Sequence, residues 1–489
     1  MPAHSIIYAL DDRPPLGRAL VLALQHMLTM FGATVAVPLL LGPSMGMSQV
    51  QIGVLISSVM LCSGLATFIQ TTFGSRLPIV QGVSFSFLAA FFAIIAAGQE
   101  QGWDGATMMQ YIAGSIIVGA LIEIVVGFSG LVGRLRRALS PVVVGPVIML
   151  IGLALFKHGA PKAGTCWSIG GLTILLVIVF SLLLARRWRF FRIFPILSAV
   201  LIVCTLCGVL SVTGVLSPEH PAHMNLGAVK AGPWVRANPA DVVLPWGAPK
   251  FALGFIIAAL AGYLASVVES FGDYHACSYM AGAGDPTPRQ ISRGIGCEGI
   301  GCLLTGLLGG FSSTSYSENI GLVGLTRVAS RYVVQLAAGM LILLGIFGKF
   351  GAFAATIPGP VVGGLYCALF GLIAAVGIQQ LAKADLSSDR NLFIAGFSLF
   401  MGLSVPAYFD GSVAAMYPPG AEPLLDSLPG VLADAIKAIG ETGMAVAAVI
   451  GVVLDNVIPG TPAERGLKVP SLLVPEAADA GEGGPERQV

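Results

Sequence analysis

The chain has 489 residues, of which 55% are hydrophobic and 10% are charged, whereas an ordinary soluble domain carries about 25% charged residues. Its mean hydropathy of +0.86 means more apolar surface than one aqueous core can bury, which excludes an ordinary soluble protein. The net charge of +1 argues against nucleic acid as a partner, and the eight cysteines lack the two-pair spacing of a zinc site. We therefore expect an integral protein of the plasma membrane (the inner membrane in a bacterium), without a metal or cofactor.

Fourteen apolar segments follow one another along the chain, and most are near the roughly 20 residues that a membrane-spanning helix needs. The sequence therefore predicts an all-α polytopic membrane protein with fourteen transmembrane segments. A short tail (1–16) precedes them, a Pro- and His-rich loop (217–250) interrupts them, and a polar tail (459–489), which we expect to be flexible, follows them. The segments are 17–42, 48–72, 78–98, 108–131, 140–157, 168–185, 194–216, 251–280, 294–310, 312–328, 332–356, 360–381, 391–408 and 440–458.

The Lys and Arg residues predict how these segments are oriented. If the N-terminus is cytoplasmic and the chain alternates, the inside loops hold about twice as many basic residues as the outside loops, as the positive-inside rule requires. Arg134, Arg136 and Arg137 lie in one such inside loop, and Arg289 and Arg293 lie in another. The even number of segments then places both termini in the cytoplasm and the long Pro- and His-rich loop outside.

Two of the segments do not look like plain spanning helices. One begins PIVQGVSFSF at Pro78 and the other is STSYSENIGLVGLTR at 313–327; each starts polar or Gly-broken and then turns apolar. Each is the third segment of a seven-segment block, and because seven is odd the second block is inverted. Interrupted segments at matching places in inverted halves point to a transporter's binding site. A helix that starts at membrane depth directs unpaired N–H groups into that site, so we expect Glu318 beside such a start, with Ser84 and Phe85 as its counterpart. The alternative is a loop whose hydroxyls cap helices.

Acids in the apolar segments are the second signal, because a carboxylate at a helix centre costs roughly 2.5–3.5 kcal/mol and therefore usually faces an interior site. Glu269 and Asp273 are four residues apart in ESFGDYHA, so they share one helix face. Their like charges repel, which favours one of them holding a proton and provides a chemical basis for proton coupling. A carboxylate here also suits a flat, uncharged ligand with two N–H groups. The alternative is a pair satisfied by neighbouring hydroxyls and amides.

Other ionisable residues allow a structural interpretation. Glu298 lies near a helix entrance, where a cap or a contact between helices is an equal alternative to a site role. We expect Glu123 and Asp455 to be structural. His26 lies in the middle of the first segment beside Gln25, where a site role and an ordinary buried hydrogen bond are both open.

Several motifs resemble those of the nucleobase–ascorbate transporters, a family that includes bacterial uracil and xanthine permeases and animal ascorbate transporters. ENIGLVGLTR matches the family signature, with Asn319, Gly321, Thr326 and Arg327 at its defining positions. ESFGDY matches the motif of the eighth span, LQHMLTMFGATVAVP the first span, QGVSFSF the third, and LDNVIPGTPAERGL the last span and tail. The motifs occur in the family's order over nearly the whole chain.

The resemblance implies fourteen spans in two inverted seven-segment repeats, with the third and tenth spans beginning as short strands and the substrate held between them. Segments 1–4 (17–131) and 8–11 (251–356) would form a core domain, and segments 5–7 (140–216) and 12–14 (360–458) a gate domain. It also implies a homodimer formed through the gate domains and an elevator-like movement of the core against the gate.

The resemblance further implies roles for single residues at the matching positions. Glu269 matches the acid that binds the base, and Glu318 matches the second position whose side chain is implicated in the site. Phe85 and Ser317 match positions whose main chain contacts the base. Asp273 matches the polar partner one turn from Glu269, Asn319 the family asparagine and His26 the first-span histidine. Ser84 and Gln25 are candidates through their neighbours Phe85 and His26.

The substrate and the coupling ion stay open at this point. Glutamate at 318 resembles uracil permeases and several broad nucleobase carriers, whereas Asp273 and the tail look closer to the animal and plant branch. We expect uracil or another pyrimidine first and xanthine or another purine next, imported with protons. Sodium coupling and ascorbate are alternatives, and an anion exchanger of the same fold is the alternative from another class. The histidines form no grouping that a membrane enzyme needs, so we expect no catalysis.

Overall fold

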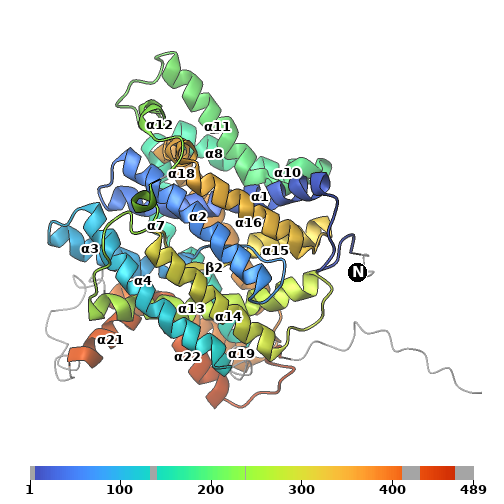
Figure 1. Cartoon of the computed structure of the whole chain (residues 1–489). Helices are drawn as coiled ribbons and strands as arrows, with labels where there is room; N and C mark the ends of the chain where they lie inside the picture. The colour runs from blue at the N-terminus through green and yellow to red at the C-terminus, as the bar shows by residue number, and fades with distance from the viewer. Residues whose placement is uncertain (1–5, 133–139, 237, 410–429, 468–489) are drawn as a thin grey trace, which may run out of the picture.

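The computed structural model describes residues 6–132, 140–236, 238–409 and 430–467 (Figure 1). Most of the described secondary structure is helical. By length and composition, eight of the described helices could cross a membrane, or nine if one bent helix pair is counted as a single span. These features agree with a mostly helical membrane protein, whereas the count of fourteen segments stays a prediction.

One group of elements combines residues from both halves of the chain. Its elements are α1 (Leu16–Ser44), α2 (Gln49–Thr72), β1 (Gln81–Val83), η1 (Phe85–Phe87), α3 (Leu88–Glu100), α4 (Gly105–Phe128), α13 (Leu253–Met280), α14 (Pro288–Leu307), β2 (Ser313–Ser315), α15 (Ser317–Thr326), α16 (Arg331–Ile346) and α17 (Gly348–Ala354). α14 lies along α4, α16 lies along α2, and α1 contacts both α2 and α16. Early and late helices therefore alternate inside one packed body.

A second group holds most of the remaining elements. They are α6 (Pro141–Leu153), α7 (Phe156–Ala163), η2 (Gly164–Cys166), α8 (Trp167–Ile178), η3 (Val179–Leu184), α9 (Ala185–Arg187), α10 (Arg189–Ile193), α11 (Pro195–Val212), α18 (Gly359–Leu381), α19 (Asp389–Phe409), α21 (Gly430–Glu441) and α22 (Gly443–Val457). α18 packs on α6, α7 and α8, while α19 packs on α22 and α6. In Figure 1 α8, α10 and α11 lie along the top and α19, α21 and α22 along the bottom, with α2, α4 and α14 between them.

The connection between the groups is irregular, as the sequence predicts for 217–250. It contains α12 (Gly227–Ala231) and the single turn η4 (Pro239–Asp241). Its last part is nevertheless fastened to the body, because the Trp246 indole N–H donates to the Gly309 carbonyl at 2.9 Å.

Local capping residues set where several helices begin. At the start of α2, the Ser48 hydroxyl accepts the Gln51 N–H (3.4 Å) and the Gln51 side chain accepts the Ser48 N–H (2.9 Å), which is a capping box. At the start of α4, the Asp104 carboxylate accepts the Thr107 N–H at 2.9 Å. Each such cap contributes about 1 kcal/mol.

The two broken segments pair with each other through β1 and β2. These strands are antiparallel, with Gln81 opposite Ser315, Gly82 opposite Thr314 and Val83 opposite Ser313. β1 leads through η1 into α3, and β2 leads into α15. The chain therefore enters two helices from one small sheet, which lies inside the body because all six strand residues are buried.

Glycine is required at the centre of this sheet. A Cβ at Gly82 would lie 2.4 Å from the ring of Tyr316, closer than real contacts allow. The Tyr316 hydroxyl uses this space to donate to the Val83 carbonyl at 3.0 Å. The glycine in QGV therefore lets an aromatic ring lie flat against the strand.

The helices α4 and α14 also approach closely at glycines. A Cβ at Gly127 would lie 2.3 Å from the main-chain nitrogen of Gly296, and one at Gly296 would lie 2.7 Å from the ring of Phe128. Small residues of this kind let helix backbones come together in a membrane, where packing replaces the hydrophobic effect.

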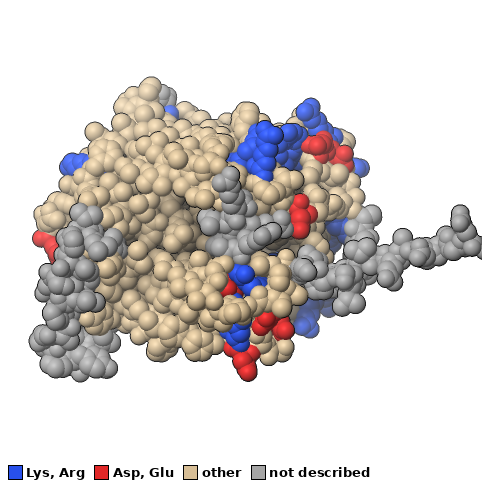
Figure 2. Space-filling view, turned by 90° about the horizontal axis from the view of Figure 1, so that it is seen from below, with Lys and Arg blue, Asp and Glu red and all other residues tan. Residues whose placement is uncertain are grey.

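Charged side chains gather toward one end of the molecule. On the face seen in Figure 2, most visible Lys, Arg, Asp and Glu side chains lie at the right, the side on which the N-terminus lies in Figure 1. Other residues cover most of the rest of the visible described surface. A broad uncharged band beside a charged rim is the surface expected of a chain that sits in a bilayer.

Asp455 fastens the end of the described chain. Its carboxylate lies 3.0 Å from the guanidinium of Arg390 and 2.6 Å from that of Arg465, and its side chain has no exposed surface. Hydrogen bonds from Ser388 and from the Thr461 N–H hold the pKa of the nearby Glu464 carboxyl below its usual range. The tail predicted to be flexible is therefore held in place as far as residue 467, and 468–489 lie outside the described residues.

We expect Asp455→Asn to destabilise the protein strongly, because it removes the buried carboxylate that two arginines share. Breaking a buried pair costs about 3–5 kcal/mol. Thermal unfolding of the detergent-purified protein would measure the loss. Asp11→Asn is the matched control: it also removes a carboxylate from an arginine, Arg331 at 2.5 Å, but the Asp11 side chain is 76% exposed and we expect almost no shift. Equal shifts for both variants would contradict this account.

Candidate functional site

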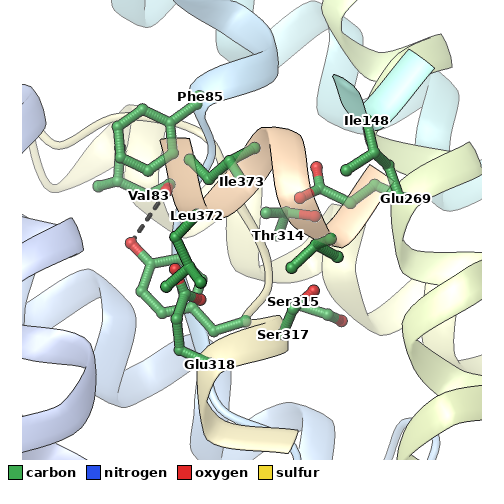
Figure 3. Close-up of a pocket in the computed structure, with 12 residues that line it drawn as sticks. Val83, Phe85, Ile148, Glu269, Thr314, Ser315, Ser317, Glu318, Leu372 and Ile373 are labelled. Carbon is green, nitrogen blue, oxygen red and sulfur yellow. Dashed lines mark hydrogen bonds between the residues drawn. The ribbon is translucent and has the colours of Figure 1, made fainter. Parts of the chain in front are cut away.

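A small pocket, with a cavity volume of about 30 Å³, lies where the two broken segments meet α13. Figure 3 shows Glu269 reaching toward Thr314 from one side, with Glu318 and Leu372 on another. The polar lining residues come from α13, β2 and the start of α15, and they are Glu269, Thr314, Ser315, Tyr316, Ser317 and Glu318. The apolar lining residues are Val83, Phe85, Ile148, Leu372, Ile373 and Val376. The last four belong to α6 and α18, so the pocket lies between the two groups of helices.

Hydrogen bonds within and between the two broken segments fix the main chain beside the pocket. The Ser84 N–H donates to the Ser312 carbonyl at 2.9 Å, which extends the pairing of β1 and β2 by one residue. The Ser84 hydroxyl accepts the Ser86 N–H at 3.2 Å and caps η1. The Tyr316 hydroxyl bond to Val83, dashed in Figure 3, joins the two segments again. Ser84 itself does not line the pocket, so the structure places it as a cap rather than as a contact.

Glu269 is held toward the pocket by one hydrogen bond. The Ser86 hydroxyl donates to its Oε2 at 3.1 Å. α13 supplies the glutamate and η1 supplies the serine, so the carboxylate is positioned by both halves of the chain. The rest of its accepting capacity faces the lining of the pocket.

Asp273 lies one turn further along α13 and does not line the pocket. Its Oδ1 accepts the Ser317 hydroxyl at 2.7 Å, while its Oδ2 is buried and has no hydrogen-bond partner within the described parts of the chain. Asp273 therefore connects α13 to the first residue of α15. Its second oxygen keeps an open position for a proton or a donor.

The electrostatics of the pocket are one-sided. Two carboxylates, those of Glu269 and Glu318, line it, and its described lining contains no Lys or Arg. Glu318 lies in the first turn of α15, where N–H groups lack partners inside the helix. This combination offers acceptors from the acids and donors from the helix start. No group of three His, Cys, Asp or Glu that could hold a metal ion occurs among residues with a described position.

His26 and Asn319 lie together outside the pocket lining. The Asn319 side-chain amide donates to the His26 carbonyl at 2.9 Å and lies 3.3 Å from His26 Nδ1. Both side chains are buried, and they tie α15 to α1. Gln25, beside His26, does not line the pocket either. None of these three residues lines the pocket, so the geometry does not support their predicted contacts with substrate. His26 and Asn319 instead lie at the contact between α1 and α15.

Of the signature residues Gly321, Thr326 and Arg327, the last two shape the end of α15, whereas Gly321 lies within the helix. The Thr326 hydroxyl donates to the Leu322 carbonyl at 2.8 Å. Arg327 adopts a left-handed conformation with φ of 60°, which ends the helix, and its carbonyl accepts the Ile7 N–H at 2.9 Å. A Cβ at Gly321 would meet nothing within 4 Å. None of the three lines the pocket.

Glu298 is another buried acid near the site, and hydrogen bonds from hydroxyl groups satisfy both oxygens of its carboxylate. It accepts hydroxyl bonds from Ser270 at 2.7 and 2.8 Å, from Tyr274 at 2.9 Å and from Ser266 at 3.2 Å. This is the contact between helices that the sequence left open as an alternative. Glu123 differs, since neither of its buried carboxylate oxygens has a hydrogen-bond partner in the described ranges.

His275, near the end of α13, points its ring back at its own helix. Its Nδ1 lies 2.8 Å from the Phe271 carbonyl, and the two rings are 4.5 Å apart. It does not line the pocket.

Several residues in or beside the pocket carry little signal in the sequence. Ser86 is one of two serines in QGVSFSF, and only the turn of η1 aims it at Glu269. Ile148, Leu372 and Ile373 are ordinary apolar residues in apolar helices, so nothing in their pattern marks them. Tyr316 stands next to the predicted site residue Ser317, and its ring could have been noticed as the partner that explains Gly82.

Comparisons with known proteins bear on the identity of this site. The model of a Permease family matches residues 17–411. The chain is 37% identical to solute carrier family 23 member 1 of Rattus norvegicus, over 95% of this chain and 82% of that protein. It is 36% identical to nucleobase-ascorbate transporter 2 of Arabidopsis thaliana, over 94% of this chain and 90% of that protein.

Solved structures of distant sequence are similar in fold. The transmembrane domain of the cyanobacterium bicarbonate transporter BicA matches with a TM-score of 0.51 at 13% identity, over 92% of this chain and 100% of that one. SLC26A9 matches with a TM-score of 0.51 at 14% identity, over 80% of this chain and 63% of that one. At these identities the likeness concerns the fold alone. The family model and the close relatives, which cover most of the chain, show that this protein belongs to the nucleobase–ascorbate transporter family.

Proposed function

We propose that this protein is a secondary active transporter that imports a nucleobase by proton symport, with uracil or another pyrimidine as the first candidate and xanthine or another purine as the next. The observation that carries the proposal is the acidic pocket at the start of α15, with Glu269 and Glu318 in its lining. Family membership supports transport of a small molecule rather than an enzymatic reaction. We expect no cofactor besides the coupling ion.

The recognition chemistry suits a flat, uncharged base. Such a base presents N–H donors beside carbonyl acceptors, and a carboxylate can accept two N–H bonds that are about twice as strong as neutral ones. We assign that role to Glu269, which Ser86 already orients. The main-chain N–H groups near Phe85 and Ser317, at two helix starts, are suited to the carbonyl oxygens of the base.

Two alternatives differ in the substrate or the ion. Sodium-coupled import of a nucleobase or of ascorbate is the first, because the plant relative is named for both substrates. Anion exchange is the second, because one structural neighbour is a bicarbonate transporter. Ascorbate and bicarbonate are anions at neutral pH, and two carboxylates with no basic residue in the described lining disfavour both.

We place proton coupling on Glu269 and Asp273. They lie one helical turn apart, and Ser317 links Asp273 to the first turn of α15. A proton on one of them lowers their mutual repulsion, so the loaded pocket can move through a low-dielectric region at less cost. Substrate at Glu269 and a proton at Asp273 would then share one small cluster.

The proposed movement uses the two groups of helices. We infer that 17–131 and 251–356 form the core domain and that 140–216 and 360–458 form the gate domain, as fourteen spans in two inverted repeats. The polar side of the pocket belongs to the core, and the gate side is apolar, with Ile148, Leu372, Ile373 and Val376. An apolar wall makes few directed bonds, so the core can slide along it in an elevator-like step. We further propose a homodimer through the gate domains, with both termini cytoplasmic in a bacterial inner membrane.

Uptake in a permease-deficient bacterium tests the function. Cells expressing the protein would be given radiolabelled uracil, xanthine or ascorbate, with and without a proton uncoupler, and with sodium replaced by choline. We expect base uptake that the uncoupler abolishes and that sodium removal leaves unchanged. Absence of base uptake together with measurable bicarbonate or chloride exchange in proteoliposomes would overturn the proposal.

Glu269→Gln should abolish transport, because an amide cannot replace a carboxylate that accepts two N–H bonds. Loss of hydrogen bonds to a charged group predicts a drop of roughly 10- to 100-fold or more in initial uptake. Glu100→Gln, a change of the same kind at an exposed position on α3, is the control and should transport normally. Near wild-type uptake by Glu269→Gln would refute the assigned role.

Glu318→Gln should shift preference from pyrimidines toward purines. The side chain lines the pocket at the start of α15, so exchanging an acceptor-only carboxylate for an amide with a donor changes which base edge fits. Competition of unlabelled uracil and xanthine against a labelled base would measure the ratio of inhibition constants. An unchanged ratio would show that selectivity lies elsewhere.

Asp273→Asn should keep substrate binding but lose accumulation. Asparagine can still accept the Ser317 hydroxyl bond, so the link to α15 remains, whereas it cannot take up a proton. Equilibrium exchange of labelled base in proteoliposomes should persist, and uphill uptake driven by a pH gradient should disappear. If uphill uptake survives, Asp273 takes no part in coupling.

A further inference from the structure

We propose that a groove between the end of α4 and the start of α14 binds the headgroup of an anionic phospholipid from the cytoplasmic leaflet. The groove is separate from the substrate pocket, since the two share no lining residue. The proposal depends on the membrane orientation inferred from charge, and it is independent of the transported substrate and of the coupling ion.

The groove is open and basic. Its volume is about 480 Å³, and its lining includes Arg289, Arg293, Ser292, Ser129 and Phe128. No acid is present in its described lining. The two arginines are one turn apart on α14, so both guanidinium groups can serve one phosphate.

The close approach of the helices explains where the groove begins. α4 and α14 lie side by side in Figure 1 and touch at Gly127 and Gly296. Beyond that contact α4 ends, and Gly130 turns the chain with φ of 76°. α14 continues back to Pro288, so its first turn extends past the end of its neighbour. The space left beside that turn is the groove.

The donors in the groove are available to a ligand. The Arg293 guanidinium donates to the Phe73 carbonyl at 2.8 Å, which orients it. Arg289 makes no salt bridge within the described parts of the chain and is exposed. Ser292 lines the groove, its residue surface is only 7% exposed, and its hydroxyl makes no hydrogen bond to any described residue. A hydroxyl that lines the groove with no described partner, beside two arginines and a helix start, is suited to phosphate oxygens.

An apolar stripe makes a lipid the favoured source of that phosphate. Leu121, Val125 and Phe128 recur at helical spacing on α4 and are 50%, 68% and 50% exposed. Phe128 also belongs to the groove, so the stripe and the basic site are continuous. An amphipathic molecule can place its acyl chain along the stripe and its phosphate on the arginines, and basic pockets between helices on the cytoplasmic side are typical lipid headgroup sites.

The test compares lipid binding by the purified full-length protein and two charge-matched variants. Arg289→Gln/Arg293→Gln removes the groove's charges, and Arg186→Gln/Arg187→Gln removes two exposed arginines of α9 on the same proposed side. Thermal stability in detergent and retained lipid in native mass spectrometry would be measured with added phosphatidylglycerol or phosphatidylcholine. Arg289→Gln alone, which disturbs no bond within the described chain, guards against misfolding of the double variant.

We expect phosphatidylglycerol, but not phosphatidylcholine, to bind and stabilise the wild-type protein and the α9 variant. The groove variants should bind it more weakly, by about fivefold for each arginine removed. Inorganic phosphate and glycerol phosphate, tested at the same concentrations, should not stabilise the protein. Equal binding of phosphatidylglycerol by all variants would overturn the proposal. So would stabilisation by inorganic phosphate as strong as that by the lipid, because the site would then be one for soluble phosphate.

Discussion

The structure depends on one constraint: main-chain N–H and C=O groups that leave a helix inside a membrane must find partners. β1 and β2 supply hydrogen-bond partners for each other, although an isolated pair of strands is only marginally stable. Side chains satisfy further N–H groups of the strands: the Thr67 hydroxyl accepts the Gln81 N–H at 2.9 Å, and the Cys302 sulfur accepts the Ser313 N–H at 3.3 Å. With the strands satisfied, the helix starts beside them can keep donors for a ligand.

The buried acids divide according to how far the protein itself satisfies them. Glu298 takes bonds from three hydroxyl side chains, so it has little capacity left for anything that moves. Glu269 and Asp273 each hold one hydroxyl, from Ser86 and Ser317, on opposite broken segments. A carboxylate that is oriented but unsaturated is suited to a ligand or a proton, whereas a saturated one is suited to holding helices together.

Sequence patterns predicted which segments lie near the pocket better than the direction in which their side chains point. The Gly and Ser breaks located both interrupted segments, in which β1 and β2 lie, and the position of Glu269 on α13 led to the pocket. The sequence left a site role and an ordinary buried hydrogen bond both open for His26, and no pattern showed that it faces Asn319 rather than the pocket. The apolar wall around Ile373 was missed because it differs from lipid-facing residues only in its neighbours. The partners of Asp455 include Arg465, which lies in a tail whose composition suggested no structure.

The pairing of β1 with β2 also bears on how the chain is made. Val83 pairs with Ser313, and Gln81 with Ser315, so the first strand enters the membrane long before its partner is synthesised. At about 5–20 residues per second, the ribosome needs roughly 10–50 seconds to supply the intervening chain. During that time the main chain of QGV cannot have its native partners, although Thr67, on the preceding helix, is already present to hold Gln81. Biogenesis of this protein therefore includes an interval in which one strand of the pair beside the pocket has been inserted without the other.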